Sequence, residues 1–135
     1  MLSAFIKGLV QSGLPICCAA ALANVGVWKN EPVRERAGAL AAKQTAELAR
    51  FRADGRFSDV RQCGTIAALD LSVGTSGYMA EVAPALCAFF IERGVLLRPL
   101  GNTIYVMPPF CITPAELAQV YAAIDEAAAR FGGRS

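Results

Sequence analysis

The segment GVLLRPLGNTIYVMPPFCIT, residues 94–113, constrains the fold of this chain more than any other stretch. Two short runs of strand-forming apolar residues, 95–98 and 103–107, flank the turn sequence Pro-Leu-Gly-Asn, and Pro108-Pro109 ends the second run. Proline fixes φ and glycine accepts turn conformations, so this spacing predicts a stiff pair of strands around a tight turn. Arg98 is the one charged residue of the segment, and such a frame would hold its guanidinium in a fixed direction.

Helices are predicted before and after this pair of strands. The pattern predicts an alanine-rich helix over 15–28 and a second helix from the N-cap Asn30 to Arg52. Strands are predicted over 60–63 and 65–71, hinged at Gly64, and a loop over 72–77. A third helix is entered through Pro84 and ends at Arg93 before the stop Gly94, and the capping box Thr113-Pro114-Ala115-Glu116 starts a last helix that ends at Phe131.

The predicted order of elements is α-α-β-β-α-β-β-α, which indicates an α+β fold. We expect a small antiparallel or mixed sheet with helices packed on one face, because this layering buries the apolar side of each element. A length of 135 residues fits one domain with a single modest core.

Composition narrows the environment of the chain. Hydrophobic residues make up 55% and charged residues 18%, so we expect apolar surface that is buried against a dimer partner or a larger parent protein. A net charge of +2 argues against nucleic acid and anionic membrane as partners, and the longest apolar run, 14–27, is too short to span a bilayer. Without a secretion signal, and with five cysteines expected to be small core residues in a reducing compartment, we expect a cytoplasmic protein.

Few residues could carry chemistry. The chain has no histidine, no CxxC spacing and no phosphate-binding glycine pattern, so a histidine base, a zinc site and a nucleotide loop are not expected. Lys7, Lys29 and Lys43 lie in polar or terminal settings that do not favour a lowered lysine pKa. We therefore assign no catalytic residue.

Arg98 is the candidate binding residue, because a fixed guanidinium fork suits bidentate capture of a carboxylate or phosphate. A solvated strand-end arginine or an ordinary ion pair is the alternative. Tyr105 either faces the same cleft or packs in the core.

The residues of the opening segment also carry a resemblance. The pattern G-V-x-x-R-P-x-G-x-x-I-Y-x-M-P-P-x-x-I resembles the C-terminal end of the adenosylmethionine-8-amino-7-oxononanoate aminotransferases, the diaminopelargonic acid synthases, a biotin-biosynthesis branch of the class III aminotransferases. The stretch DVRQCGTIAALDL is similar to the family's preceding strand pair, and PICCAAALANVGVW is similar to its N-P-x-A-C-A-A-A-L-A helix.

This resemblance implies a fold-type I aminotransferase that uses pyridoxal phosphate and is normally a homodimer. In the family, the arginine that matches Arg98 binds the carboxylate of the keto-acid substrate 8-amino-7-oxononanoate, and S-adenosylmethionine is the amino donor. By the same resemblance we expect Arg98 and Tyr105 to bind substrate.

Residues 15–135 are similar to the C-terminal small domain of the family. We expect 1–14 to be a divergent lead-in, such as a truncated gene, a frame-shifted gene or an artificial boundary would produce. Ser12 stands where the family usually carries a threonine or methionine, so no phosphate-binding role is assigned to it. The family's Schiff-base lysine belongs to a large domain upstream, so we expect these residues alone to bind no cofactor tightly and to be inactive. The alternatives are a non-catalytic dimerisation or interaction module, and a half-enzyme complemented by a separate large-domain chain.

Overall fold

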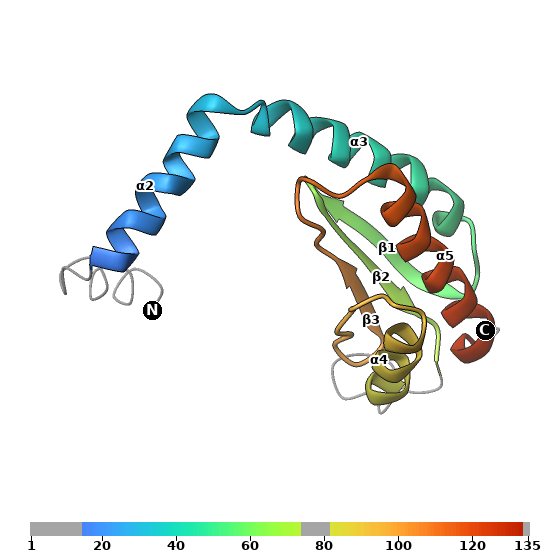
Figure 1. Ribbon diagram of the computed structural model, residues 1–135. Helices are drawn as coiled ribbons and strands as arrows, with labels where there is room; N and C mark the ends of the chain where they lie inside the picture. Colours follow the sequence, from blue (N-terminus) through green and yellow to red (C-terminus); the bar gives the residue numbers. More distant parts are fainter. Residues whose placement is uncertain (1–14, 74–81, 134–135) are drawn as a thin grey trace. The chain divides into compact units, whose positions relative to one another are not determined.

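A computed structural model of the protein describes residues 15–73 and 82–133 (Figure 1). The chain divides into two compact units, residues 1–35 and 36–135. The described elements are α2 (Pro15–Asn30), α3 (Val33–Arg52), β1 (Phe57–Cys63), β2 (Ile66–Leu71), α4 (Val82–Glu92), β3 (Thr103–Val106) and α5 (Pro114–Phe131).

In the first unit, α2 is a continuous helix with no buried residue. Its alanines favour the helix, and Gly26 does not interrupt it. Apolar side chains are exposed along its length, among them Ile16, Leu22 and Trp28 at 76%, 72% and 50%.

In the second unit, three strands form an antiparallel sheet in the order β1-β2-β3. The expected choice between an antiparallel and a mixed sheet is therefore settled in favour of the antiparallel one. Gly64 turns β1 into β2 with a φ of 57°, in the left-handed region where glycine is at ease, which confirms the predicted hinge. In the registers of the two pairs, Ala68 lies between Arg61 on β1 and Tyr105 on β3.

The core lies on one face of the sheet. Alternate side chains of β2 and β3 are buried, and they pack with buried side chains of α3, α4 and α5 in one hydrophobic cluster. Helices on one face confirm the predicted layering. Inside this cluster the Tyr121 hydroxyl donates to Gln44 Oε1 at 3.0 Å, and Gln44 Nε2 donates to the Thr65 carbonyl at 2.6 Å. Burial raises the pKa of the Tyr121 phenol well above its usual value.

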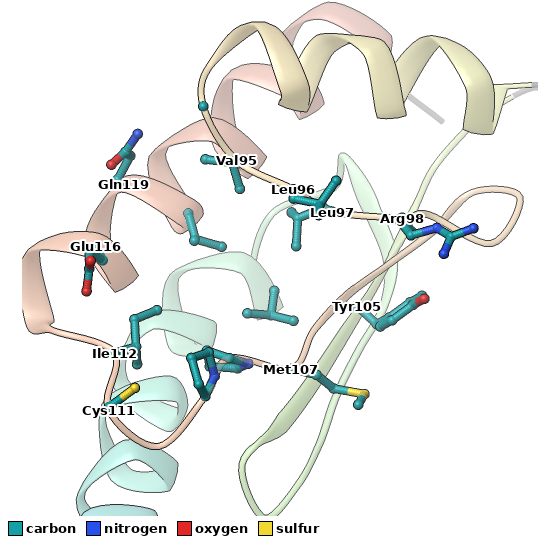
Figure 2. A pocket seen from close by; sticks show the side chains of 15 residues that line it. Val95, Leu96, Leu97, Arg98, Tyr105, Met107, Cys111, Ile112, Glu116 and Gln119 are labelled. Atoms are coloured by element: carbon teal, nitrogen blue, oxygen red, sulfur yellow. The ribbon is translucent and has the colours of Figure 1, made fainter.

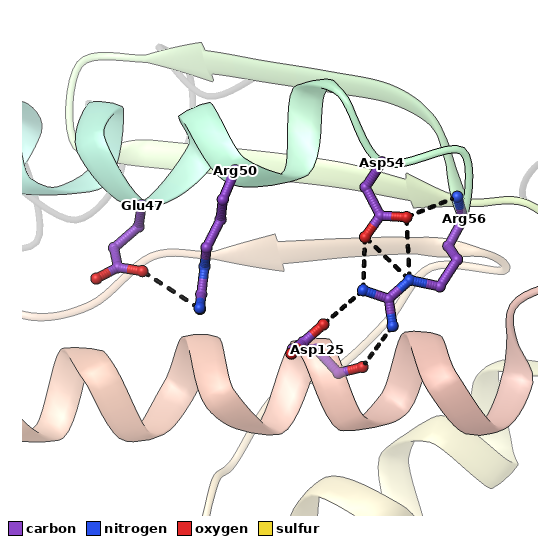
Figure 3. A network of polar contacts seen from close by, with 5 residues as sticks. All are labelled: Glu47, Arg50, Asp54, Arg56 and Asp125. Carbon is purple, nitrogen blue, oxygen red and sulfur yellow. Dashed lines mark hydrogen bonds and ion pairs between the residues drawn. The ribbon is translucent and has the colours of Figure 1, made fainter.

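A polar network joins the end of α3 to α5 (Figure 3). Arg56 binds both carboxylate oxygens of Asp54 and reaches Asp125 on α5, where its Nη2 lies 2.6 Å from Oδ1. The Arg56 guanidinium lowers the pKa of the Asp54 carboxyl, and both carboxylates raise the pKa of Arg56. The predicted capping box at the start of α5 is also present, since Glu116 N donates to Thr113 Oγ1 and Thr113 N donates to Glu116 Oε2.

Several sequence predictions need correction. Residues 95–98 are extended but form no strand. Their pairing with β3 is limited to the bridge Leu100–Thr103, and Pro99, the residue before this bridge, has no N–H to donate to a strand partner. Asn30 ends α2 and does not cap α3, which starts after Pro32. Four cysteines are exposed and Cys87 is half-buried, so the cysteines are not core residues; all five are free. The predicted loop 72–77 lies largely outside the described residues.

Candidate functional site

Arg98 lies in the extended segment that follows α4. Gly94 adopts a φ of 70° and turns the chain out of the helix, and the Val95 N–H donates to the Phe90 carbonyl at 2.9 Å. Side chains then alternate: Val95 and Leu97 are buried in the core, whereas Leu96 and Arg98 are exposed. This alternation directs the guanidinium away from the hydrophobic cluster.

A two-residue turn connects this segment to β3. Leu100 and Thr103 exchange backbone hydrogen bonds of 2.9 and 3.0 Å around Gly101 and Asn102. Gly101 has a φ of 61°, whereas Asn102 has a negative φ, as a type II′ hairpin turn requires. The pattern Gly-Asn therefore gives a tight turn at the predicted place.

Tyr105 is half-buried on the face of the sheet that carries no helix, since its neighbours Ile104 and Val106 point into the core. Figure 2 shows the Arg98 and Tyr105 side chains next to each other, both directed away from α5. Within residues 15–73 and 82–133, no hydrogen bond or ion pair engages the guanidinium of Arg98 or the hydroxyl of Tyr105. By contrast, Arg61 on the same sheet face bonds to Asp59 and Asp70 at 2.6 and 2.7 Å.

A pocket of about 620 Å³ opens between the Arg98 segment, the residues that follow β3 and the start of α5. Its walls are mostly apolar, with Leu96, Met107, Ile112 and others, and Arg98 and Tyr105 stand at one end (Figure 2). The volume is that of a small-molecule site. The arrangement suits an elongated apolar ligand whose anionic end meets the guanidinium.

The residues that line this pocket do not fit pyridoxal phosphate, the cofactor that the resemblance implies. No lysine lines the 620 Å³ pocket, so nothing there could form the Schiff base. Lys29 is an exposed residue of α2. Lys43 lies with Arg36 at a separate pocket of about 140 Å³ on α3, and Lys7 lies outside the described residues. The expectation that this chain supplies no tight cofactor site thus remains a prediction.

The structure places Arg98 and Tyr105 at the same end of the pocket, which is one of the two alternatives that the sequence left open for Tyr105. It also adds two features that sequence patterns did not reveal. One is the pocket, which exists because residues 95–98 diverge from β3 where the sequence predicted paired strands. The other is Asn102, whose buried amide bonds to the Leu71 carbonyl at 2.8 Å. The Gly-Asn pair signals the turn in the sequence, but the contact with Leu71 spans 31 positions and has no local signature.

Comparisons with known proteins match most of the chain. The family profile of the class-III aminotransferases matches residues 7–128. Over 125 residues the chain is 35% identical to the adenosylmethionine-8-amino-7-oxononanoate aminotransferase of Synechococcus elongatus, covering 90% of this chain and 28% of that protein. It is 32% identical over 125 residues to the 5-aminovalerate aminotransferase DavT of Pseudomonas aeruginosa, covering 88% of this chain and 29% of that protein.

Among solved structures, the adenosylmethionine-8-amino-7-oxononanoate aminotransferase of Methanocaldococcus jannaschii superposes with a TM-score of 0.75 at 27% identity, covering 84% of this chain and 27% of that one. The chain therefore spans less than a third of the length of the relatives that it matches. In the part of the chain that the structure describes, no helix combines the length and hydropathy needed to cross a bilayer.

Proposed function

Because the chain belongs to the class III aminotransferase family, we propose that it forms the substrate-carboxylate-binding small domain of an adenosylmethionine-8-amino-7-oxononanoate aminotransferase. One observation carries this proposal: Arg98 is exposed and engaged by no described side chain, and it stands beside Tyr105 at the end of an apolar pocket. The identity to the Synechococcus elongatus enzyme supports this specificity over that of the 5-aminovalerate relative by a small margin.

Arg98 would bind the substrate carboxylate with two parallel N–H donors, and the Tyr105 hydroxyl would donate a further hydrogen bond. Fixing the carboxylate sets the position of the other end of the chain, where the ketone accepts the amino group. Pyridoxal phosphate, when bound to the full enzyme, supplies the electron sink for amino transfer. We assign that cofactor to a large domain from the same polypeptide or from a partner chain, and we place the assembled enzyme in the cytoplasm as a homodimer.

Complementation tests this function. The 135-residue chain is mixed with the cofactor-bearing large domain of the Synechococcus elongatus relative, and formation of 7,8-diaminononanoate from S-adenosylmethionine and 8-amino-7-oxononanoate is measured. We expect activity in the mixture and none from either part alone. The relative's own small domain is the positive control. If that control restores activity and this chain does not, the proposal is wrong.

Borohydride reduction tests the absence of a cofactor site. The chain is incubated with equimolar pyridoxal phosphate, reduced, and analysed by intact mass and peptide mapping. We expect no stoichiometric adduct. One full adduct on Lys7, Lys29 or Lys43 would show that these residues build a cofactor site of their own, and the assignment to another domain would have to be abandoned.

A second candidate is a non-catalytic interaction module, which the exposed apolar side chains of α2 favour. It predicts no activity in the complemented mixture and no effect of Arg98→Ala on the binding of carboxylates. The substitution therefore separates the two candidates.

A further inference from the structure

Asn102 is a buried polar residue at the tip of the turn between Arg98 and β3, with 2% of its surface exposed. Its Nδ2 donates to the Leu71 carbonyl at 2.8 Å, and its own carbonyl accepts from the Leu71 N–H at 2.9 Å. Asn102 thus bonds to both backbone groups of the last residue of β2. These bonds attach the turn to the C-terminal end of the central strand.

The segment that carries Arg98 has few other attachments. Its backbone is held at one end by the bond from Val95 N to the Phe90 carbonyl, and at the other by the pair Leu100–Thr103. Between these points, in the described part of the chain, no backbone hydrogen bond joins residues 96–98 to another segment. The buried side chain of Leu97 and the fastened turn therefore fix where Arg98 stands.

We propose that Asn102 is a positioning residue for the carboxylate site, acting through the turn on Arg98. This inference rests on the proposed role of Arg98 in binding a carboxylate. Without the amide, the Leu71 carbonyl loses its side-chain donor, and one of the two bonds between Asn102 and Leu71 is lost. The guanidinium would then no longer be held beside Tyr105, and a displacement of about 1 Å is enough to weaken a site substantially.

Gln44 offers a matched control. It is also fully buried, and its Nε2 also donates to a backbone carbonyl, that of Thr65, at 2.6 Å. It lies on α3 and bonds to no residue of the turn. Gln44→Ala therefore removes the same kind of bond without touching the attachment of Arg98.

The test uses the whole 135-residue chain, labelled with ¹⁵N, and octanoate as the carboxylate probe. Two quantities are measured: the heteronuclear NOE of the Arg98 backbone amide, and the octanoate dissociation constant from the shift of the Arg98 Nε–Hε signal. For Asn102→Ala we expect a lower NOE and roughly tenfold weaker octanoate binding. For Gln44→Ala we expect a lower melting temperature with both Arg98 quantities unchanged.

The inference is overturned if Asn102→Ala keeps the wild-type NOE and affinity, or if Gln44→Ala alters both to the same extent. Should the alanine variant not fold, Asn102→Asp keeps the size of the side chain and replaces the donor by a carboxylate. We expect a lowered Arg98 NOE at pH 7, and recovery at pH 4, where a protonated carboxyl can again donate to Leu71. An NOE that is the same at both pH values and equal to that of the wild type refutes the inference.

The proposed function can fail separately. If the wild-type chain does not bind octanoate, the carboxylate role of Arg98 is wrong. The positioning effect is then judged from the Arg98 NOE alone, with the same two outcomes.

Discussion

Replacing Arg98 should weaken carboxylate binding strongly and leave folding intact. The guanidinium is exposed and, among the described residues, has no hydrogen-bond or ion-pair partner, so Arg98→Ala removes no polar contact from the folded chain. We expect the free energy of unfolding to change by less than about 0.5 kcal/mol. For a chain of this length, that is a melting-temperature shift of less than about 2 °C. A bidentate charge-assisted contact contributes about 1.5–3 kcal/mol, so octanoate binding should weaken roughly 10- to 150-fold.

The assay pairs thermal unfolding with octanoate titration on the same samples. Arg98→Lys keeps the charge without the fork and should recover only part of the affinity. Arg61→Ala is the matched control, because Arg61 lies on the same sheet face and bonds to Asp59 and Asp70. It should lower stability and leave binding unchanged. Wild-type affinity in Arg98→Ala, or a stability loss above about 1 kcal/mol, would refute the reasoning from exposure and missing partners.

Three further predictions concern the frame that holds the site. Because the pKa of Asp54 is lowered in the folded chain, its pair with Arg56 stabilises the fold above about pH 4 and loses this effect as the pH falls further. The difference in unfolding free energy between wild type and Arg56→Ala should therefore become smaller in acid. Tyr121→Phe leaves the buried Gln44 Oε1 without its donor and should cost about 1–3 kcal/mol in urea unfolding; a neutral result contradicts the importance of this bond. Gly101→Ala forces an L side chain to a φ of 61° and should destabilise the turn by about 1 kcal/mol, whereas an unchanged urea midpoint would show that the turn relaxes.

Local rules predicted most of the elements of this fold. The capping box at Thr113 and Glu116 placed the start of α5 correctly, because each of its bonds joins residues that lie three apart. Gly64 and Gly94 marked a hinge and a helix stop, and both have the positive φ that their positions need. The strand predicted over 65–71 is present as β2, and its alternate side chains Ala67, Leu69 and Leu71 are buried.

Long-range competition decided the rest. Residues 95–98 have the composition of a strand, but the pairing with β3 is limited to the bridge Leu100–Thr103. The side chains of Val95 and Leu97 are instead buried in the hydrophobic core. The same departure opens the pocket beside Arg98, so no strand pattern could have indicated it. The usual burial of cysteine predicts core positions for these residues, yet four of the five are exposed. Composition alone does not show which positions of the fold reach the surface.

Part of the high apolar content of the chain lies on the exposed surface of α2. Much of it belongs to α2, where Ile16, Leu22, Val25 and Trp28 are all at least 49% exposed. A helix that is apolar on every side is stable in water only when other protein surface encloses it. The site around Arg98, in contrast, stands on a sheet whose other face already has its own core.

We therefore expect the two units to differ in a hydrogen-exchange experiment on the chain alone. Exchange of the α2 amides should be fast, and exchange of the β2 and β3 amides should be slow. Equal protection in both would mean that α2 finds its cover without a partner.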